Sequence, residues 1–94
     1  MNLNLNDKNA LVCGSTQGIG KAAAIGLASE GVKVTLVSRN EAKLKAVIAD
    51  LPNAQLHDYI VADFMDPEGL KSKVEAYIQN NQRFHILVNN TGGP

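Results

Sequence analysis

Short apolar runs and longer amphipathic segments alternate along this chain. The apolar runs predict four strands, at residues 8–13, 33–38, 55–62 and 85–89. Helical patterns lie between them and predict three helices, at 18–30, 41–51 and 67–80. The second helix has the clearest apolar face, formed by Leu44, Val47, Ile48 and Leu51. Strands that alternate with helices of this length indicate βαβ units and therefore an α/β fold with a parallel sheet.

The second strand, at 33–38, is almost continuously apolar, which is typical of a parallel strand buried on both faces. Right-handed crossovers place the first two helices on one face of the sheet and the third on the other. The expected arrangement is a Rossmann-like doubly wound parallel sheet with strand order 3-2-1-4. Because one helix cannot cover a whole face, we expect the sheet to be incomplete at this length. Residues 1–94 then form the N-terminal part of one domain, and the chain is expected to break off at Pro94.

Residues at the ends of the predicted helices support these boundaries. Asn40 and Asp66 are plausible N-caps for the second and third helices, and Pro67 suits a first helical position. Gly31 follows the first helix as a C-terminal glycine does. Five apolar residues of the first helix are expected to pack on the sheet: Ile19, Ala22, Ala23, Ile25 and Leu27.

The composition of the chain excludes several classes of partner. Nine basic residues balance nine acidic ones, and no basic cluster suggests nucleic acid or an anionic membrane as a partner. We see neither a signal peptide nor a membrane span, so we expect a cytoplasmic protein that acts on a small molecule. Cys13 ends an apolar strand and is expected to be an inert buried thiol. His57 and His85 lack partners at metal or catalytic spacing and are expected at the surface or at strand edges. No metal site is predicted.

The glycines after the first strand predict an anion site. Gly14, Gly18 and Gly20 lie between an apolar run and an alanine-rich helix. The first N–H groups of a helix lack internal partners and lie at the positive end of its dipole, so glycines allow a phosphate to approach them. The spacing fits neither Gly-x-Gly-x-x-Gly nor the phosphate loop of nucleotide triphosphatases. A glycine-rich turn before an ordinary helix is the simpler alternative.

Four strand-end signals together resemble the short-chain dehydrogenase/reductase family. The segment Gly14-Ser15-Thr16-Gln17-Gly18-Ile19-Gly20 resembles its Gly-x-x-x-Gly-Ile-Gly loop. Ser38-Arg39-Asn40, Asp63 and Asn89-Asn90-Thr91-Gly92 follow the next three strands in the family's order. The resemblance covers the whole chain. Within the family, the chain resembles the 3-oxoacyl-thioester reductases.

The resemblance implies the following contacts with a dinucleotide. Gly14, Gly18, Ile19 and Gly20 form the pyrophosphate loop, which Ser15, Thr16 and Gln17 line. Asp63 accepts a hydrogen bond from the adenine amino group, and Phe64 flanks the ring. The backbone at Asn90, Thr91 and Gly92 passes along the ribose. Two residues depart from the family pattern, since Cys13 replaces a threonine and Thr91 replaces an alanine.

Arg39 indicates which dinucleotide is bound. An acidic residue after the second strand would bind the ribose hydroxyls of NAD, whereas an arginine fork can bind the 2′-phosphate of NADP. NADP is therefore expected as the cofactor and NAD is disfavoured. A solvated loop arginine is the alternative.

The family's catalytic Tyr-x-x-x-Lys motif is not identifiable, because Tyr59 precedes Asp63 and Tyr77 precedes Asn81 at that spacing. We therefore assign no catalytic residue and expect the 94-residue chain to be inactive by itself. The resemblance implies that the intact protein is an NADP(H)-dependent oxidoreductase acting on a carbonyl or alcohol, with 3-oxoacyl thioesters as one candidate class. It is also expected to be a homo-oligomer. The alternatives are a non-catalytic dinucleotide-binding or sensing module complete at this length, and a domain for another adenine nucleotide, such as a methyltransferase.

Overall fold

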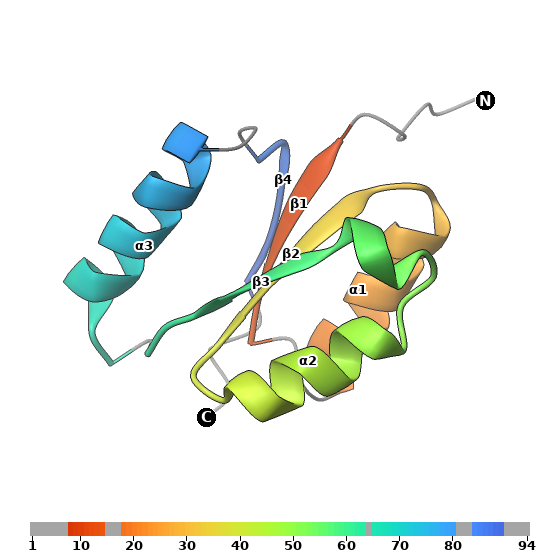
Figure 1. The fold of residues 1–94 in the computed structure, drawn as a ribbon, viewed down its shortest axis with the longest axis horizontal. Coiled ribbons are helices and arrows are strands. Elements are labelled where there is room, and N and C mark those ends of the chain that lie inside the picture. Colours follow the sequence, from red (N-terminus) through yellow and green to blue (C-terminus); the bar gives the residue numbers. More distant parts are fainter. Residues whose placement is uncertain (1–7, 15–17, 64, 81–83, 90–94) are drawn as a thin grey trace.

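The chain folds as a parallel sheet with helices on both faces (Figure 1). The structure is a computed structural model and describes residues 8–14, 18–63, 65–80 and 84–89. The strands are β1 (Asn9–Cys13), β2 (Lys33–Ser38), β3 (Asp58–Val61) and β4 (Ile86–Asn89). The helices are α1 (Gly18–Ser29), α2 (Glu41–Ala49) and α3 (Pro67–Asn80), with a short 3-10 helix at Ala54–Leu56. None of the helices in the described residues is long and apolar enough to cross a membrane.

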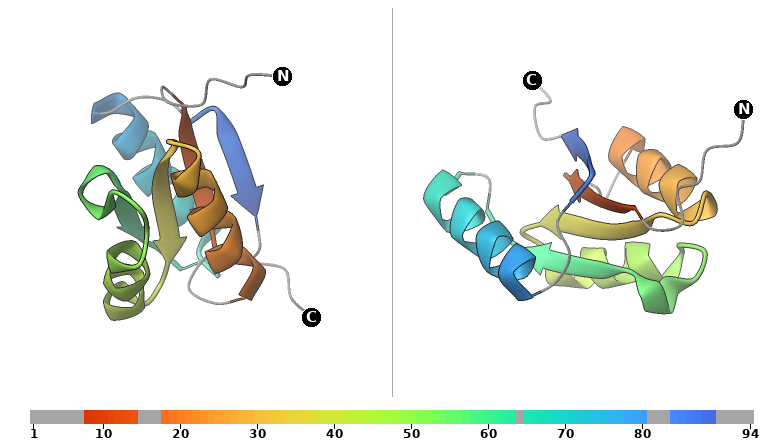
Figure 2. Two further views of the ribbon diagram at one scale, coloured as in Figure 1. Left: turned by 90° about the vertical axis from the view of Figure 1, so that its right-hand side faces the viewer. Right: turned by 90° about the horizontal axis from the view of Figure 1, so that it is seen from above.

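The sheet has the predicted order β3-β2-β1-β4, and every pairing within it is parallel. Helices α1 and α2 lie on one face and α3 lies on the other (Figure 2). This is the layering that right-handed crossovers require. The predicted Rossmann-like doubly wound fold is therefore confirmed.

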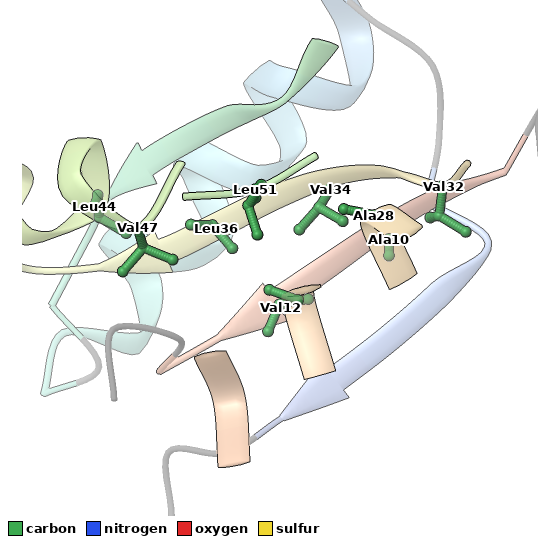
Figure 3. Close-up of a cluster of buried hydrophobic side chains, with 10 residues drawn as sticks. Ala10, Val12, Ala28, Val32, Val34, Leu36, Leu44, Val47 and Leu51 are labelled. Carbon is green, nitrogen blue, oxygen red and sulfur yellow. The ribbon is translucent and has the colours of Figure 1, made fainter. Parts of the chain in front are cut away.

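The larger core lies between the sheet and helices α1 and α2 (Figure 3). Alternate residues of the two central strands point into it: Ala10, Val12, Val34 and Leu36. From α1, Ala24 and Ala28 are buried one turn apart, whereas Ala22 is exposed. The expectation that Ala22 packs on the sheet is therefore wrong, whereas Ile25 and Leu27 pack against this core as expected. The small side chains of Ala24 and Ala28 let the helix backbone approach the sheet closely.

The second core lies between the sheet and α3. It contains Leu11, Cys13, Val37, Ile60 and Ala62, against which residues of α3 pack. Thr35 of β2 is also buried on the sheet, and its hydroxyl lies 3.2 Å from Tyr77 Oη. The ring of Tyr77 stacks on Phe84 with centroids 5.4 Å apart. A buried hydroxyl thus has a polar partner on the helix that covers it.

The predicted helix ends are formed by hydrogen bonds. Gly31 has φ 87°, and its N–H donates to Ala28 O while that of Val32 donates to Leu27 O, which is the Schellman arrangement. Asn40 Oδ1 accepts the N–H of Lys43 at 3.1 Å. Asp66 Oδ1 accepts the N–H of Gly69 at 3.2 Å and so caps α3. All three end signals are confirmed.

Two elements differ from the prediction by two or three residues at one end. The third strand was expected at 55–62, but β3 begins only at Asp58, because Ala54–Leu56 forms a 3-10 helix after Asn53 in the left-handed region at φ 56°. Helix α2 ends at Ala49, and Asp50 caps it. Leu51 nevertheless lies in the core that α2 covers. The remaining elements agree to within one residue wherever the chain is described.

Candidate cofactor-binding site

The strand register brings three of the predicted site residues to one edge of the sheet. Cys13 pairs with Val37 of β2 and with Asn89 of β4, and Ser38 pairs with Val61 of β3. Gly14 and Arg39 come directly after the ends of β1 and β2, and Asp63 comes two residues after the end of β3. The carboxyl edge of an open parallel sheet is where such folds bind ligands.

Gly14 turns the chain out of β1. Its φ of 70° lies in the left-handed region, which a residue with a Cβ adopts only at a cost. Its N–H donates to Val37 O at 2.9 Å and extends the ladder between β1 and β2 by one bond. Helix α1 then begins at Gly18 and includes Ile19 and Gly20. The backbone therefore has the predicted strand, turn and helix around this glycine segment.

Arg39 lies in the connection between β2 and α2 and is exposed. Around it, the N–H of Asn40 lies 3.4 Å from Ser38 Oγ, and Asn40 caps α2. Among the described residues, no ion pair holds the Arg39 guanidinium. Its charge is therefore presented to solvent at the carboxyl edge of the sheet.

Asp63 lies one residue beyond the ladder, since the N–H of Ala62 donates to Ser38 O at 3.0 Å. The aspartate is exposed, and its Oδ1 accepts the N–H of Met65 at 2.9 Å. Its backbone carbonyl accepts the N–H of Asp66 at 2.9 Å. These bonds fix the turn into α3. Asp63 Oδ2 makes no hydrogen bond to the described residues and can accept one from a ligand.

The other predicted contacts concern residues outside the described ranges. These residues are Ser15, Thr16, Gln17, Phe64, Asn90, Thr91 and Gly92. Their assignments to the pyrophosphate, adenine and ribose remain predictions. In the described ranges, no three His, Cys, Asp or Glu side chains gather as a metal-binding group would require.

Cys13 is buried, as predicted, and lies on the α3 face of β1. Burial raises the pKa of its thiol above the ordinary value. Since the thiolate is the reactive form, this cysteine is unsuited to act as a nucleophile at neutral pH.

The sequence did not reveal a contact between β3 and the start of α2. Tyr59 Oη donates a hydrogen bond of 2.8 Å to Glu41 Oε2. This hydrogen bond raises the pKa of the Tyr59 hydroxyl, with smaller contributions from burial and from the charges of Glu41 and Asp58. A further contact joins α3 to β3, where Lys73 Nζ donates to Val61 O at 2.6 Å. Helical periodicity carries no signal for either contact.

Two histidines form hydrogen bonds at the opposite, amino-terminal edge of the sheet. His57 Nδ1 accepts the N–H of Val34 at 3.0 Å, and its Nε2 lies 2.8 Å from Pro52 O. His85 Nδ1 accepts the N–H of Asn9 at 3.1 Å. Each histidine immediately precedes one of the two outer strands, β3 and β4, so the predicted positions at strand edges are correct. Their role as acceptors for the backbone of β1 and β2 was not foreseen.

The doubly wound sheet, with a glycine turn after β1 and polar residues after β2 and β3, defines a dinucleotide-binding type of α/β domain. The chain belongs to the short chain dehydrogenase family, whose family model matches residues 8–94.

Curated relatives of several kinds match nearly the whole chain. An uncharacterised oxidoreductase of Bacillus subtilis is 43% identical over 98% of this chain. The inactive hydroxysteroid dehydrogenase-like protein 1 of Homo sapiens is 41% identical and the very-long-chain 3-oxoacyl-CoA reductase of Anas platyrhynchos is 39% identical, each over 88% of this chain. The chain spans only 34%, 26% and 27% of the length of these three relatives, respectively.

Solved structures agree with the fold. L-sorbose reductase from Gluconobacter frateurii, complexed with NADPH and L-sorbose, superimposes with a TM-score of 0.85 at 32% identity, covering 99% of this chain and 36% of the reductase. A variant of actinorhodin polyketide ketoreductase with NADPH gives a TM-score of 0.80 at 32% identity, covering 93% of this chain and 34% of the ketoreductase.

Proposed function

We propose that the intact protein is an NADP(H)-dependent oxidoreductase that interconverts a carbonyl and an alcohol, and that residues 1–94 supply the N-terminal part of its cofactor-binding domain. The observation that carries this proposal is the exposed Arg39 at the carboxyl end of β2, which pairs with β1 and so lies beside the strand that Gly14 follows. The oxidoreductase class follows from family membership. Two reductases with similar folds contain NADPH, which supports this form of the cofactor.

The residues on the described edge fit a dinucleotide. Gly14 has no Cβ, so a ligand can approach the backbone closely where the chain leaves β1. The start of α1 provides N–H groups for a pyrophosphate. Arg39 offers a planar fork of donors to a 2′-phosphate, for which an acidic residue would be repulsive. Asp63 Oδ2 can accept a hydrogen bond from the adenine amino group. When bound, the nicotinamide cofactor supplies or accepts the hydride.

We propose that the substrate should be sought by assaying the reduction of carbonyl compounds. The relatives and similar structures include a reductase of L-sorbose, a polyketide ketoreductase and a 3-oxoacyl-CoA reductase. We therefore propose a ketone as the substrate, with a ketose sugar and a 3-oxoacyl thioester as the two classes to assay. NADPH oxidation by the intact protein should exceed a no-protein blank with at least one of them.

Cofactor binding tests Arg39 directly. In the intact protein, NADPH should bind more tightly than NADH, and Arg39→Asp should abolish or reverse this preference by about 1–3 kcal/mol. Lys45→Asp provides a matched control, because it makes the same charge reversal at an exposed position within α2. Its cofactor preference should equal that of the unaltered protein. Equal affinities of the unaltered protein for NADPH and NADH would refute the assignment.

A second candidate is a non-catalytic dinucleotide-binding protein. The specific observation that favours it is the relative described as inactive, which is 41% identical to this chain. The two candidates share the cofactor site and differ in turnover. NADPH binding by the intact protein, together with no oxidation of NADPH by any ketone in the panel, would favour this second candidate.

A further inference from the structure

A tyrosine hydroxyl joins β3 to the first turn of α2, next to the proposed phosphate site. Tyr59 Oη donates to Glu41 Oε2 at 2.8 Å. Glu41 is the first residue of α2 and is exposed, and it lies two positions after Arg39. The proposed cofactor contacts make no use of this carboxylate, although a negative charge at this place bears on any phosphate bound nearby.

The sheet topology shows on which side of β2 the hydrogen bond to Tyr59 holds the Glu41 carboxylate. Strand β3 lies on the side of β2 opposite to β1. Tyr59 pairs with Leu36 of β2, and Leu36 lies three residues before Arg39 in the sequence. The bond therefore ties Glu41 toward β3, whereas the glycine turn at the end of β1 lies on the other side of β2.

A carboxylate released from this bond would remain close to Arg39. Residues two apart in sequence have Cα atoms at most about 7 Å apart, and both side chains are long. A free Glu41 can pair with the guanidinium and occupy the donors that a phosphate needs. It also repels a phosphate electrostatically, and exposed charges a few ångströms apart still interact in water.

We propose that Tyr59 is a positioning residue for cofactor choice: its hydroxyl holds the Glu41 carboxylate on the β3 side and so keeps Arg39 available for a 2′-phosphate. This inference rests on the proposed function, because it requires that NADP binds at Arg39.

Tyr59→Phe in the intact protein tests the proposal by removing only the donor. The dissociation constant for NADPH should rise about two- to fivefold, the size of one exposed charge interaction, while that for NADH stays unchanged. Adding Glu41→Gln to this variant should restore the original NADPH affinity, because the amide carries no charge. Tyr77→Phe is the matched control, since it removes the other described tyrosine hydroxyl on the opposite face of the sheet, and both affinities should stay unchanged.

Glu41→Asp tests the same bond from its other partner. It retains the charge but shortens the side chain by one methylene, so the carboxylate no longer reaches Tyr59 Oη, and the same selective loss of NADPH affinity is expected. An unchanged NADPH affinity in both variants would overturn the proposal, and so would an equal loss for NADPH and NADH. If the unaltered protein binds both cofactors equally, the proposed function fails first and the inference fails with it. If NADPH is preferred and Arg39→Asp abolishes that preference, the Tyr59 variants decide the inference alone.

Discussion

Replacing His57 should destabilise the amino-terminal edge of the sheet by a predictable amount. Its Nδ1 is the acceptor for the N–H of Val34, a residue with no exposed surface. Leaving a buried donor without an acceptor costs about 1–3 kcal/mol. The second contact, from Nε2 to Pro52 O, is exposed and contributes less. We therefore expect His57→Ala to lower the free energy of unfolding by about 2 kcal/mol.

His57→Asn separates the acceptor from the rest of the ring. The side-chain oxygen of asparagine can take a position close to that of Nδ1 and can accept the N–H of Val34. This variant should lose less than about 1 kcal/mol, which reflects the lost contact to Pro52 and the smaller side chain. Gln55→Ala is the control, because Gln55 is exposed in the same connection and should change the stability by no more than about 0.5 kcal/mol.

Two measurements on the intact protein check this reasoning. Urea unfolding gives the change in free energy, and amide hydrogen exchange follows the N–H of Val34 itself. In His57→Ala, exchange at Val34 should quicken about 30-fold, the factor that corresponds to 2 kcal/mol. The explanation is wrong if His57→Asn costs as much as His57→Ala, because the ring, and not its acceptor atom, would then provide the stability.

Two further predictions concern helix glycines and the thiol. Gly26→Ala should raise the free energy of unfolding by about 0.5–1 kcal/mol, because it removes a glycine from the interior of α1 and its Cβ meets no atom within 4 Å. Gly69→Ala should give no such gain, because its Cβ would lie 2.9 Å from Asp66 Cγ and would displace the side chain that caps α3. Urea unfolding measures the change in the free energy of unfolding for both variants. Cys13 should react with iodoacetamide at pH 8 far more slowly in the native protein than in urea, since its raised pKa leaves less thiolate at that pH and burial blocks access. Equal alkylation rates under the two conditions would show that the native thiol is accessible.

Local patterns sufficed for the features that depend on neighbouring residues. The bounds of β2 follow from one nearly continuous apolar run, and the caps at Asn40 and Asp66 from residue type beside a helical pattern. Strand order follows from the alternation of elements and the handedness of crossovers. The same order places Gly14, Arg39 and Asp63 on one edge, so the arrangement of these three candidates was also predictable.

Features that depend on distant residues could not be predicted in this way. The contact of Tyr59 with Glu41 spans 18 positions and that of Asn9 with His85 spans 76. The first depends on how α2 packs against β3 and the second on the register of β1 and β4, and periodicity specifies neither. The start of β3 was missed because an Asn in the left-handed region and a short 3-10 helix interrupt a sequence that reads as extended.

The two edges of this sheet can change independently in evolution and in protein engineering. Strand β1 has five residues, so its ends lie roughly 13–17 Å apart, beyond the range at which substitutions usually couple and beyond the screening length of charges at physiological salt. Arg39 lies at one edge and the histidine acceptors lie at the other. Variants that alter cofactor choice should therefore combine additively with variants that stabilise the histidine edge. If the proposed function holds, residue 39 can be exchanged without compensating changes at the histidine edge.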